Sequence, residues 1–187
     1  MRVADTEICC VKLLIPDVFP DKRGYFFESF NSNVLKKNNI CFIPIQTNYA
    51  FSLRKGTLRG IHFQDGKSSQ AKIVKCIKGS VLDYAIDLRK SSPTYMKYVC
   101  RELNEINQEQ LFIPKGFGHA VISLEDNSAI EYMVDSPYSP SDEKTIIFND
   151  AKLNIKWPFP EKAIIVSEKD ASASQIDNLL YKFEETL

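Results

Sequence analysis

Short apolar runs separated by Gly, Pro, Asn, Asp and Ser recur along the whole chain. Their spacing of roughly 8–12 residues is typical of an all-β sandwich or barrel. Many of the runs are rich in Val, Ile, Tyr and Phe, which suit a pleated, half-buried surface. The pattern predicts strands at Ile8–Leu14, Tyr25–Phe30, Phe42–Phe51, Thr57–Gln64, Gln70–Ile77, Ser80–Leu88, Tyr95–Glu102, Gln110–Ile113, His119–Ser123, Ala129–Asp135 and Thr145–Phe148.

Helical patterning is confined to Asn31–Asn38 and to a C-terminal segment, Ser174–Glu185. In the C-terminal segment Ser174 is placed to cap a helix. The apolar residues that recur there at helical spacing are Ile176, Leu179, Leu180 and Phe183. No internal repeat or linker interrupts the 187 residues. We therefore predict one mostly antiparallel β domain spanning residues 1–187, with a C-terminal helix at about 174–185.

Charge and cysteine content narrow the classes of partner. Lys plus Arg balances Asp plus Glu at 24 each, so neither nucleic acid nor an anionic membrane is expected as a partner. No apolar stretch approaches the roughly 18 residues of a membrane helix, and no secretion signal is visible. The five cysteines are odd in number and lack metal-ligand spacing, which favours reduced thiols and a cytoplasmic location.

Only two histidines, His62 and His119, offer a base that titrates near neutral pH. The spacing Pro114-x-Gly116-x-x-His119 resembles the second half of the cupin metal motif. The first half is incomplete: Gly56 precedes His62 by the right interval, but Gln64 stands where a second histidine belongs. No glutamate follows before Gly79, and two neutral imidazoles alone make a weak divalent site. The chain is therefore predicted to be an all-β cupin, a jelly-roll sandwich with a few short flanking helices, without metal or cofactor.

An enzyme of this kind needs organic acid–base groups, and strand alternation suggests two. Lys72 shares a face with Val74 and Cys76, so its ammonium is expected in an apolar enclosure. Tyr132 shares a face with Ile130 and Val134. Each residue also has a plain structural interpretation, an edge lysine that reaches water and a core tyrosine with a hydrogen-bonded hydroxyl.

Strict alternation places His62 on one face with Leu58 and Gln64, and Arg59 on the opposite face. If Arg59 and His62 line one site, a bulge or a strand end near Gly60 must redirect Arg59. Together with Lys72 and Tyr132, His62 then forms a possible proton-transfer constellation.

The chain resembles the dTDP-4-dehydrorhamnose 3,5-epimerase family along most of its length. The segments that carry the resemblance are Asp21-Lys22-Arg23-Gly24-Tyr25-Phe26-Phe27-Glu28, Gln46-Thr47-Asn48, Gly56-Thr57-Leu58-Arg59-Gly60-Ile61-His62-Phe63-Gln64, Gln70-Ala71-Lys72, Asp87-Leu88-Arg89, Ser92-Pro93-Thr94, Ile113-Pro114-Lys115-Gly116-Phe117-Gly118-His119, Glu131-Tyr132, Tyr138-Ser139-Pro140, Asn149-Asp150, Trp157-Pro158 and Ser167-Glu168-Lys169-Asp170. The resemblance implies epimerisation at C3 and C5 of a nucleotide-linked 4-keto-6-deoxy sugar.

The same resemblance implies roles for individual residues. His62 is the base, Asp170 orients and charge-balances it, Lys72 stabilises the enolate and Tyr132 is the opposing acid. The residues implied to bind substrate are Arg23, Phe26, Glu28, Gln46, Asn48, Arg59, His119, Tyr138, Glu143 and Lys169. The family forms homodimers in which N-terminal strands cross to the partner, so Arg23 and Glu28 are candidates for the neighbouring subunit's site.

The chain departs from the family pattern at four positions. Gly118, Ala120 and Val121 replace residues of a Gly-Phe-Ala-His-Gly-Phe run, and Ala50 replaces a serine. These changes concern the sugar or base pocket and leave the acid–base set intact. Three alternatives remain open: an epimerase that inverts C3 or C5 alone or acts on the 4-keto sugar of another nucleotide, a metal-dependent cupin with His62 and His119 as ligands, and a cupin that binds a sugar without catalysis.

Overall fold

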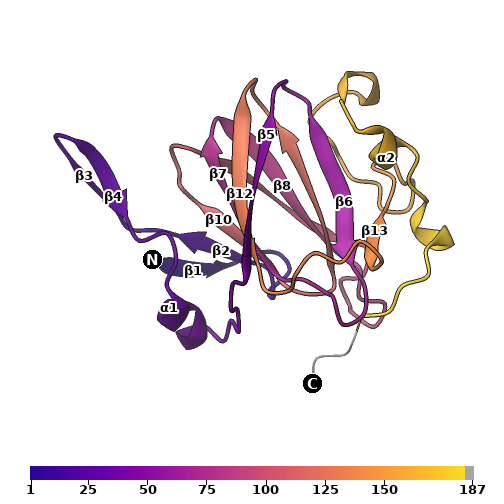
Figure 1. Ribbon diagram of the computed structural model, residues 1–187, viewed down its shortest axis with the longest axis horizontal. Coiled ribbons are helices and arrows are strands. Elements are labelled where there is room, and N and C mark those ends of the chain that lie inside the picture. Colours follow the sequence, from indigo (N-terminus) through magenta and orange to yellow (C-terminus); the bar gives the residue numbers. More distant parts are fainter. Residues whose placement is uncertain (184–187) are drawn as a thin grey trace.

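The computed structural model describes residues 1–183 as a sandwich of two antiparallel sheets with a separate two-stranded hairpin (Figure 1). One sheet has six strands in the order β1-β2-β10-β7-β12-β5, and the other has five in the order β13-β6-β11-β8-β9. The six strands are β1 (Arg2–Asp5), β2 (Lys12–Ile15), β5 (Gln46–Ser52), β7 (Lys72–Lys78), β10 (Gln110–Ile113) and β12 (Ser128–Val134). The five are β6 (Leu58–Gln64), β8 (Ser80–Asp87), β9 (Tyr98–Asn104), β11 (Phe117–Ser123) and β13 (Glu143–Thr145). The predicted all-β cupin class is confirmed.

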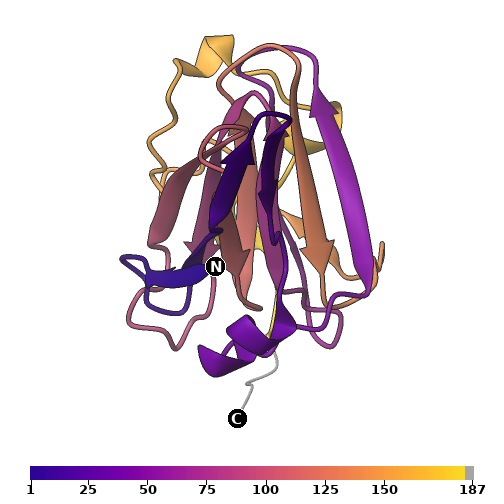
Figure 2. The same ribbon diagram turned by 90° about the vertical axis from the view of Figure 1, so that its left-hand side faces the viewer.

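The space between the sheets holds the main apolar core, which both sheets supply with inward side chains. Its buried members are Ile8, Val11, Val74, Cys76, Val81, Ala85, Val99, Leu103, Leu111, Ile113, Phe117, Val121 and Ile130. A second cluster fills the outer face of the five-stranded sheet beneath the C-terminal segment, which lies beside β6 in Figure 1. A third lies under α1 (Ser32–Lys37), which Figure 2 shows at the lower end of the strands. Because the second and third clusters bury apolar side chains on the outer faces, the fold does not need an apolar filling along the whole space between the sheets. One end of that space is free to hold polar groups.

The predicted helix at 31–38 is confirmed as α1, where the Asn31 side chain accepts hydrogen bonds from the backbone N–H groups of Asn33 and Val34. The predicted C-terminal helix is wrong over 174–183, and residues 184–185 of that prediction lie outside the described part. Only a 3-10 turn, Ile176–Asn178, forms there. The Ser174 carbonyl accepts the Ile147 N–H instead of capping a helix.

The apolar side chains of this C-terminal segment are used by tertiary contacts rather than by a helical face. Ile176 is buried in the outer cluster, while Leu180 is 91 % exposed. The rings of Tyr181 and Phe183 pack on Phe63, with centroids 5.3 and 5.6 Å away. These contacts require an extended chain, which is why the helical spacing was misleading.

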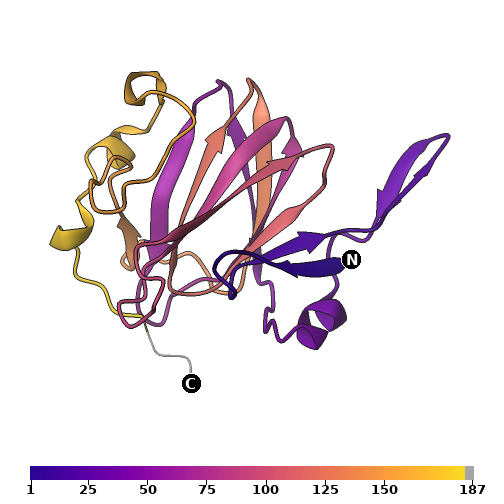
Figure 3. The same cartoon turned by 180° about the vertical axis from the view of Figure 1, so that it is seen from behind.

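Four elements were absent from the prediction: β1, the strand β3 (Val18–Asp21), the 3-10 turn η1 (Glu161–Ala163) and the helix α2 (Glu168–Ala171). The strand β3 pairs with β4 (Gly24–Phe27) in a hairpin that projects from the body of the sandwich (Figures 1 and 3). The Ser167 hydroxyl caps α2 by accepting the Asp170 N–H at 3.1 Å. Among the described residues, no helix is long and apolar enough to cross a membrane.

A bulge in β6 sets the geometry of the site. His119 of β11 pairs with His62, but Val121 pairs with Arg59, so three residue steps on β6 face two on β11. Gly60 sits in the bulge with φ +119°, and a Cβ there would lie 2.5 Å from the His119 carbonyl oxygen. The expected bulge near Gly60 is confirmed. It also shifts Leu58 into the outer cluster, so the expected shared face of Leu58 and His62 is wrong.

Candidate active site

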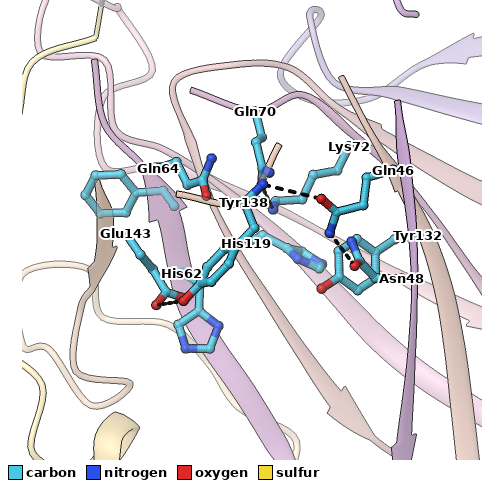
Figure 4. A pocket seen from close by; sticks show the side chains of 11 residues that line it. Gln46, Asn48, His62, Gln64, Gln70, Lys72, His119, Tyr132, Tyr138 and Glu143 are labelled. Carbon is cyan, nitrogen blue, oxygen red and sulfur yellow. Dashed lines mark hydrogen bonds between the residues drawn. The ribbon is translucent and has the colours of Figure 1, made fainter. Parts of the chain in front are cut away.

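Two cavities occupy one end of the inter-sheet space and share His62, His119 and Tyr132. The first, of about 260 Å³, is predominantly polar, and Figure 4 shows its side chains. It is lined by Gln46, Asn48, His62, Phe63, Gln64, Gln70, Lys72, His119, Tyr132, Tyr138 and Glu143. The second, of about 460 Å³, is lined by Ala50, Thr57, Leu58, Arg59, His62, His119, Val121, Ile130, Tyr132, Ile165, Val166, Ser167, Lys169 and Asp170.

A hydrogen bond joins His62 to Asp170. The His62 Nε2 lies 2.7 Å from Asp170 Oδ1, and the other carboxylate oxygen faces the Gly60 N–H at 3.4 Å. Asp170 is only 4 % exposed. Burial alone would raise its pKa, but the hydrogen bond and charge of His62 outweigh burial and lower the pKa of Asp170. A carboxylate held ionised in this way keeps Nε2 of His62 as a donor, which leaves Nδ1 as the nitrogen that can accept a proton.

Lys72 enters the first cavity from β7 and is 8 % exposed. Its Nζ donates to Gln70 Oε1 at 3.0 Å and lies 5.6 Å from the centre of the Tyr132 ring, within cation–π range. Burial lowers the pKa of Lys72 to about 8, and the nearby carboxylates of Glu143, Asp83 and Asp135 act in the opposite direction. The expected enclosure of this ammonium is confirmed.

Tyr132 faces the same space from β12, packed against the inter-sheet core. Burial raises the pKa of its phenol, so the hydroxyl stays protonated at neutral pH. Its ring centre lies 6.3 Å from that of His119. Because β12 and β6 belong to different sheets, Tyr132 and His62 flank the cavity from opposite walls.

His119 forms a second histidine–carboxylate pair with Asp83 of β8, Nε2 to Oδ1 at 2.6 Å. The Asp83 side chain is fully buried, and its Oδ2 is one of two buried side-chain atoms without a partner in the described chain. The His62 side chain is 32 % exposed and that of His119 10 % exposed. The pair at His62 is thus the more accessible one.

Polar side chains form the rim. The Tyr138 hydroxyl donates to Glu143 Oε2 at 3.0 Å, and Lys169 of α2 forms an ion pair with the same carboxylate. Burial acts to raise the pKa of Glu143, but these two donors hold it below its ordinary value. On β5, Gln46 donates to Asn48 Oδ1 at 2.7 Å. Arg59 reaches the second cavity and donates through Nη2 to the Phe51 carbonyl at 2.7 Å.

Three of the residues expected to bind substrate lie away from both cavities in the single chain. Arg23 and Phe26 belong to the projecting hairpin, where the Arg23 side chain is 84 % exposed and paired with Asp21. Glu28 follows the hairpin and accepts a hydrogen bond from Asn31. The remaining expected site residues, catalytic and binding, line one or both cavities.

The sequence reasoning missed three polar residues of the site. Gln64 and Gln70 line the first cavity, and Asp83 orients His119. Asp83 carried a usable signal, because alternation along β8 places its carboxylate on the core face with Val81 and Ala85. Each glutamine bonds to backbone groups far along the chain, Gln64 to Pro137 and Ser139 and Gln70 to Ser136, and no local pattern marks these partners.

The four departures from the family pattern divide by location. Ala50 and Val121 line the second cavity, so they alter its wall directly. Ala120 is fully buried in the outer cluster. A Cβ at Gly118 would lie 2.7 Å from Ile61 Cγ2, so the glycine there is matched to its neighbour. Within residues 1–183, no group of three or more His, Cys, Asp or Glu side chains is arranged to hold a metal ion.

Comparison with known proteins gives consistent matches. The family model described as dTDP-4-dehydrorhamnose 3,5-epimerase matches residues 5–178. The dTDP-4-dehydrorhamnose 3,5-epimerase of Salmonella typhimurium strain LT2 is 40 % identical over 183 residues, covering 96 % of this chain and 98 % of that protein.

Solved structures agree. The dTDP-4-dehydrorhamnose 3,5-epimerase of Elizabethkingia anophelis superimposes with a TM-score of 0.90 at 36 % identity, covering 95 % of this chain and 97 % of the other. The dTDP-6-deoxy-D-glucose-3,5-epimerase of Legionella pneumophila, in complex with dTDP-4-keto-L-rhamnose, has a TM-score of 0.90 at 34 % identity, covering 95 % and 94 %. The expected relationship is therefore confirmed, and the chain belongs to the dTDP-4-dehydrorhamnose 3,5-epimerase family of sugar-nucleotide isomerases.

Proposed function

We propose that this chain inverts C3 and C5 of dTDP-4-dehydro-6-deoxy-D-glucose to give dTDP-4-dehydro-L-rhamnose, with His62, Asp170, Lys72 and Tyr132 as its catalytic residues. The observation that carries the assignment of residues is the His62–Asp170 hydrogen bond on a cavity that also holds the buried Lys72 ammonium. A ketone at C4 acidifies the C–H bonds on both sides, so one acid–base set can serve both centres. The dTDP-4-keto-L-rhamnose bound in the Legionella pneumophila relative, which is the product of the proposed reaction, supports the same sugar class.

In the first step Nδ1 of His62 takes the proton from the carbon beside the ketone, while Nε2–H stays bonded to Asp170. The C–H electrons move into the C3–C4 or C4–C5 bond, and the ketone becomes an enolate. The charged Lys72 stabilises the enolate oxygen, an interaction that gains strength where water is excluded.

In the second step Tyr132 returns a proton to the same carbon from the opposite face. Its phenol is protonated at neutral pH, and it faces His62 across the cavity from the other sheet. The phenolate then recovers its proton from solvent and His62 releases its own, so the cycle balances without a redox partner.

The cations of the second cavity suit the diphosphate. Arg59 and Lys169 line that cavity and are exposed at its rim. A guanidinium presents paired donors that match phosphate oxygens. Gln46, Asn48, Tyr138, Glu143 and His119 then contact the sugar and nucleoside. All five cysteines are free thiols, which supports a cytoplasmic enzyme.

We further propose a homodimer in which the β3–β4 hairpin supplies Arg23, Phe26 and Glu28 to the partner's site. The hairpin leaves large apolar groups uncovered, with Phe19 61 %, Tyr25 58 % and Phe26 71 % exposed. A two-stranded hairpin is marginally stable alone, so a partner surface is needed to hold this one.

Complementation tests the exchange of hairpins. Arg23→Ala and His62→Asn chains are each expected to be inactive, because each lacks one part of every site. Mixed dimers would contain one complete site, so unfolding and refolding the two together should restore about a quarter of the wild-type activity, as random pairing of a symmetric dimer gives. No recovery in confirmed mixed dimers would place Arg23 in its own chain's site.

The reaction itself is tested in deuterated water with dTDP-4-dehydro-6-deoxy-D-glucose. Wild-type protein should introduce deuterium at C3 and C5 and invert both, as read by proton NMR. His62→Asn should slow exchange at both carbons by about 10²–10⁴-fold, the usual range for loss of a general base. Label at one carbon only would restrict the activity to a single centre, and exchange at the wild-type rate in folded His62→Asn would exclude His62 as the base.

Tyr132→Phe should separate exchange from inversion. The ring and its packing remain, but the proton donor on the far face is lost. The enolate still forms, and His62 can return the proton from the original side. We therefore expect deuterium incorporation with retained configuration, and inversion reduced by about 10²-fold or more. Equal losses of exchange and inversion, or intact inversion, would remove Tyr132 from the mechanism.

The lowered pKa of Lys72 predicts where kcat/KM begins to fall at alkaline pH. The ammonium loses its proton at a pKa of about 8, so kcat/KM should fall as pH rises through 8. The free energy of unfolding should instead rise with pH over the range from 8 to the ordinary lysine pKa of 10.5. In that range the unfolded chain binds a proton at Lys72 that the folded chain does not.

Lys72→Met should abolish turnover and raise the free energy of unfolding at pH 7, by at most about 3 kcal/mol from the shift in pKa. This difference from wild type should shrink above pH 8, as followed by urea unfolding. The matched control Lys78→Met, at the exposed end of the same strand, should leave both profiles unchanged. An alkaline limb that begins only above pH 10 would contradict the buried cation.

A further inference from the structure

Tyr138 lies across the first cavity without support from the core. It belongs to the loop between β12 and β13, is 53 % exposed, and extends its hydroxyl to Glu143 beside His62 (Figure 4). Its backbone N–H donates to Gln46 Oε1 at a long 3.3 Å. A side chain placed in this way depends on hydrogen bonds to its loop for its position.

Gln64 supplies two of those bonds, one on each side of Tyr138. It is 5 % exposed and makes three hydrogen bonds to backbone groups. Its Nε2 donates to the carbonyl of Pro137 at 3.0 Å, and its Oε1 accepts from the N–H of Ser139 at 2.7 Å. The two residues that flank Tyr138 are thus both tied to one amide. The third bond, from Nε2 to the Ser68 carbonyl at 2.6 Å, ties the neighbouring turn to the same amide.

The location of Gln64 couples the loop to the base. Gln64 follows His62 by two positions on β6, so both side chains face the cavity. Its strand partner across the ladder is Glu143, the residue that accepts the Tyr138 hydroxyl. One strand therefore fixes the proposed base, the backbone on both sides of Tyr138 and the partner of its hydroxyl.

The chemistry of the amide explains why glutamine is used here. The side chain must donate to two carbonyls and accept from one N–H, and only a carboxamide offers both kinds of group in one rigid plane. Glutamate lacks the donors, lysine lacks the acceptor, and asparagine is one methylene shorter.

We propose that Gln64 is a positioning residue for substrate binding, which acts by holding Tyr138 as a wall of the sugar cavity in a fixed place relative to His62. This inference rests on the proposed function, because it requires the substrate to occupy the first cavity. Gln64 itself forms no bond to the reacting groups; its contribution passes through the loop.

A double-mutant cycle tests whether Gln64 acts through Tyr138. Gln64→Met keeps the length of the side chain and removes all three bonds. It should raise KM for dTDP-4-dehydro-6-deoxy-D-glucose about tenfold and change kcat by less than about threefold, since ground-state binding is what it weakens. Tyr138→Ala should raise KM by a similar factor, and the double variant should be no worse than Tyr138→Ala, because one interaction has been removed twice. Multiplicative effects on KM would overturn the positioning role.

Two further variants separate positioning from general stability. Gln64→Glu keeps the acceptor for Ser139 and should give an intermediate KM. If Gln64→Met does not fold, Gln64→Glu replaces it in the double-mutant cycle with Tyr138→Ala. Asp150→Asn is the matched control, since Asp150 is also buried and holds three backbone N–H groups, but it lines neither cavity. It should lower Tm without changing KM. A rise in KM that tracks Tm across all variants would reduce Gln64 to a structural residue.

The failure of this inference is distinguishable from failure of the proposed reaction. Wild-type protein that neither exchanges nor inverts the substrate would refute the reaction. An active wild type with independent effects of Gln64→Met and Tyr138→Ala would refute the positioning role alone. Calorimetric binding of dTDP-4-dehydro-6-deoxy-D-glucose to the same variants on a His62→Asn background provides a measurement that does not depend on turnover, and the Gln64→Met change should weaken it only where Tyr138 is present.

Discussion

The close approach of β6 and β11 at Gly60 is the constraint on which the site depends. The bulge places Arg59 and His62 on the same side of β6, although three positions separate them. It also directs the Gly60 N–H toward the carboxylate of Asp170. Only glycine fits, because a side chain would meet the backbone of His119 and Ala120. One backbone irregularity thus brings the proposed phosphate ligand, base and orienting carboxylate together.

The cavity also depends on an unequal distribution of buried charge. Lys72, Asp83, His119 and Asp170 are all at most 8 % exposed, and burial of this kind is costly unless charges are compensated. Asp170 is compensated by His62 and by the Gly60 N–H, and its pKa is lowered. Lys72 has one neutral acceptor, Gln70, and its pKa is lowered because burial dominates. The site therefore holds a cation with little compensation in the protein, where a developing enolate oxygen would supply what is missing.

Local rules predicted most of the strands and suggested Lys72, Tyr132 and His62 as site residues, whereas Asp170 and the binding residues were implied by the family resemblance. Period-two alternation placed Lys72 and Tyr132 correctly, and the conflict between Arg59 and His62 pointed to the bulge. The C-terminal segment failed because its apolar spacing fits a helix equally well, whereas Phe63 and the outer cluster provide better partners for an extended chain. Tertiary contacts decide between the helix and the extended chain, and a local stretch of sequence does not reveal those contacts.

Gln64 illustrates the same limit within the site. Its place beside His62 was visible, but its role depends on loops that begin four and more than seventy residues away. Glutamine in a strand carries no local signature of such partners, whereas Asp83 does, since a carboxylate on a core face needs a compensating donor. Residues that act directly on a substrate are thus accessible from pattern, chemistry and family resemblance. Residues that hold them in place become visible only once the fold has brought their backbone partners within hydrogen-bond distance.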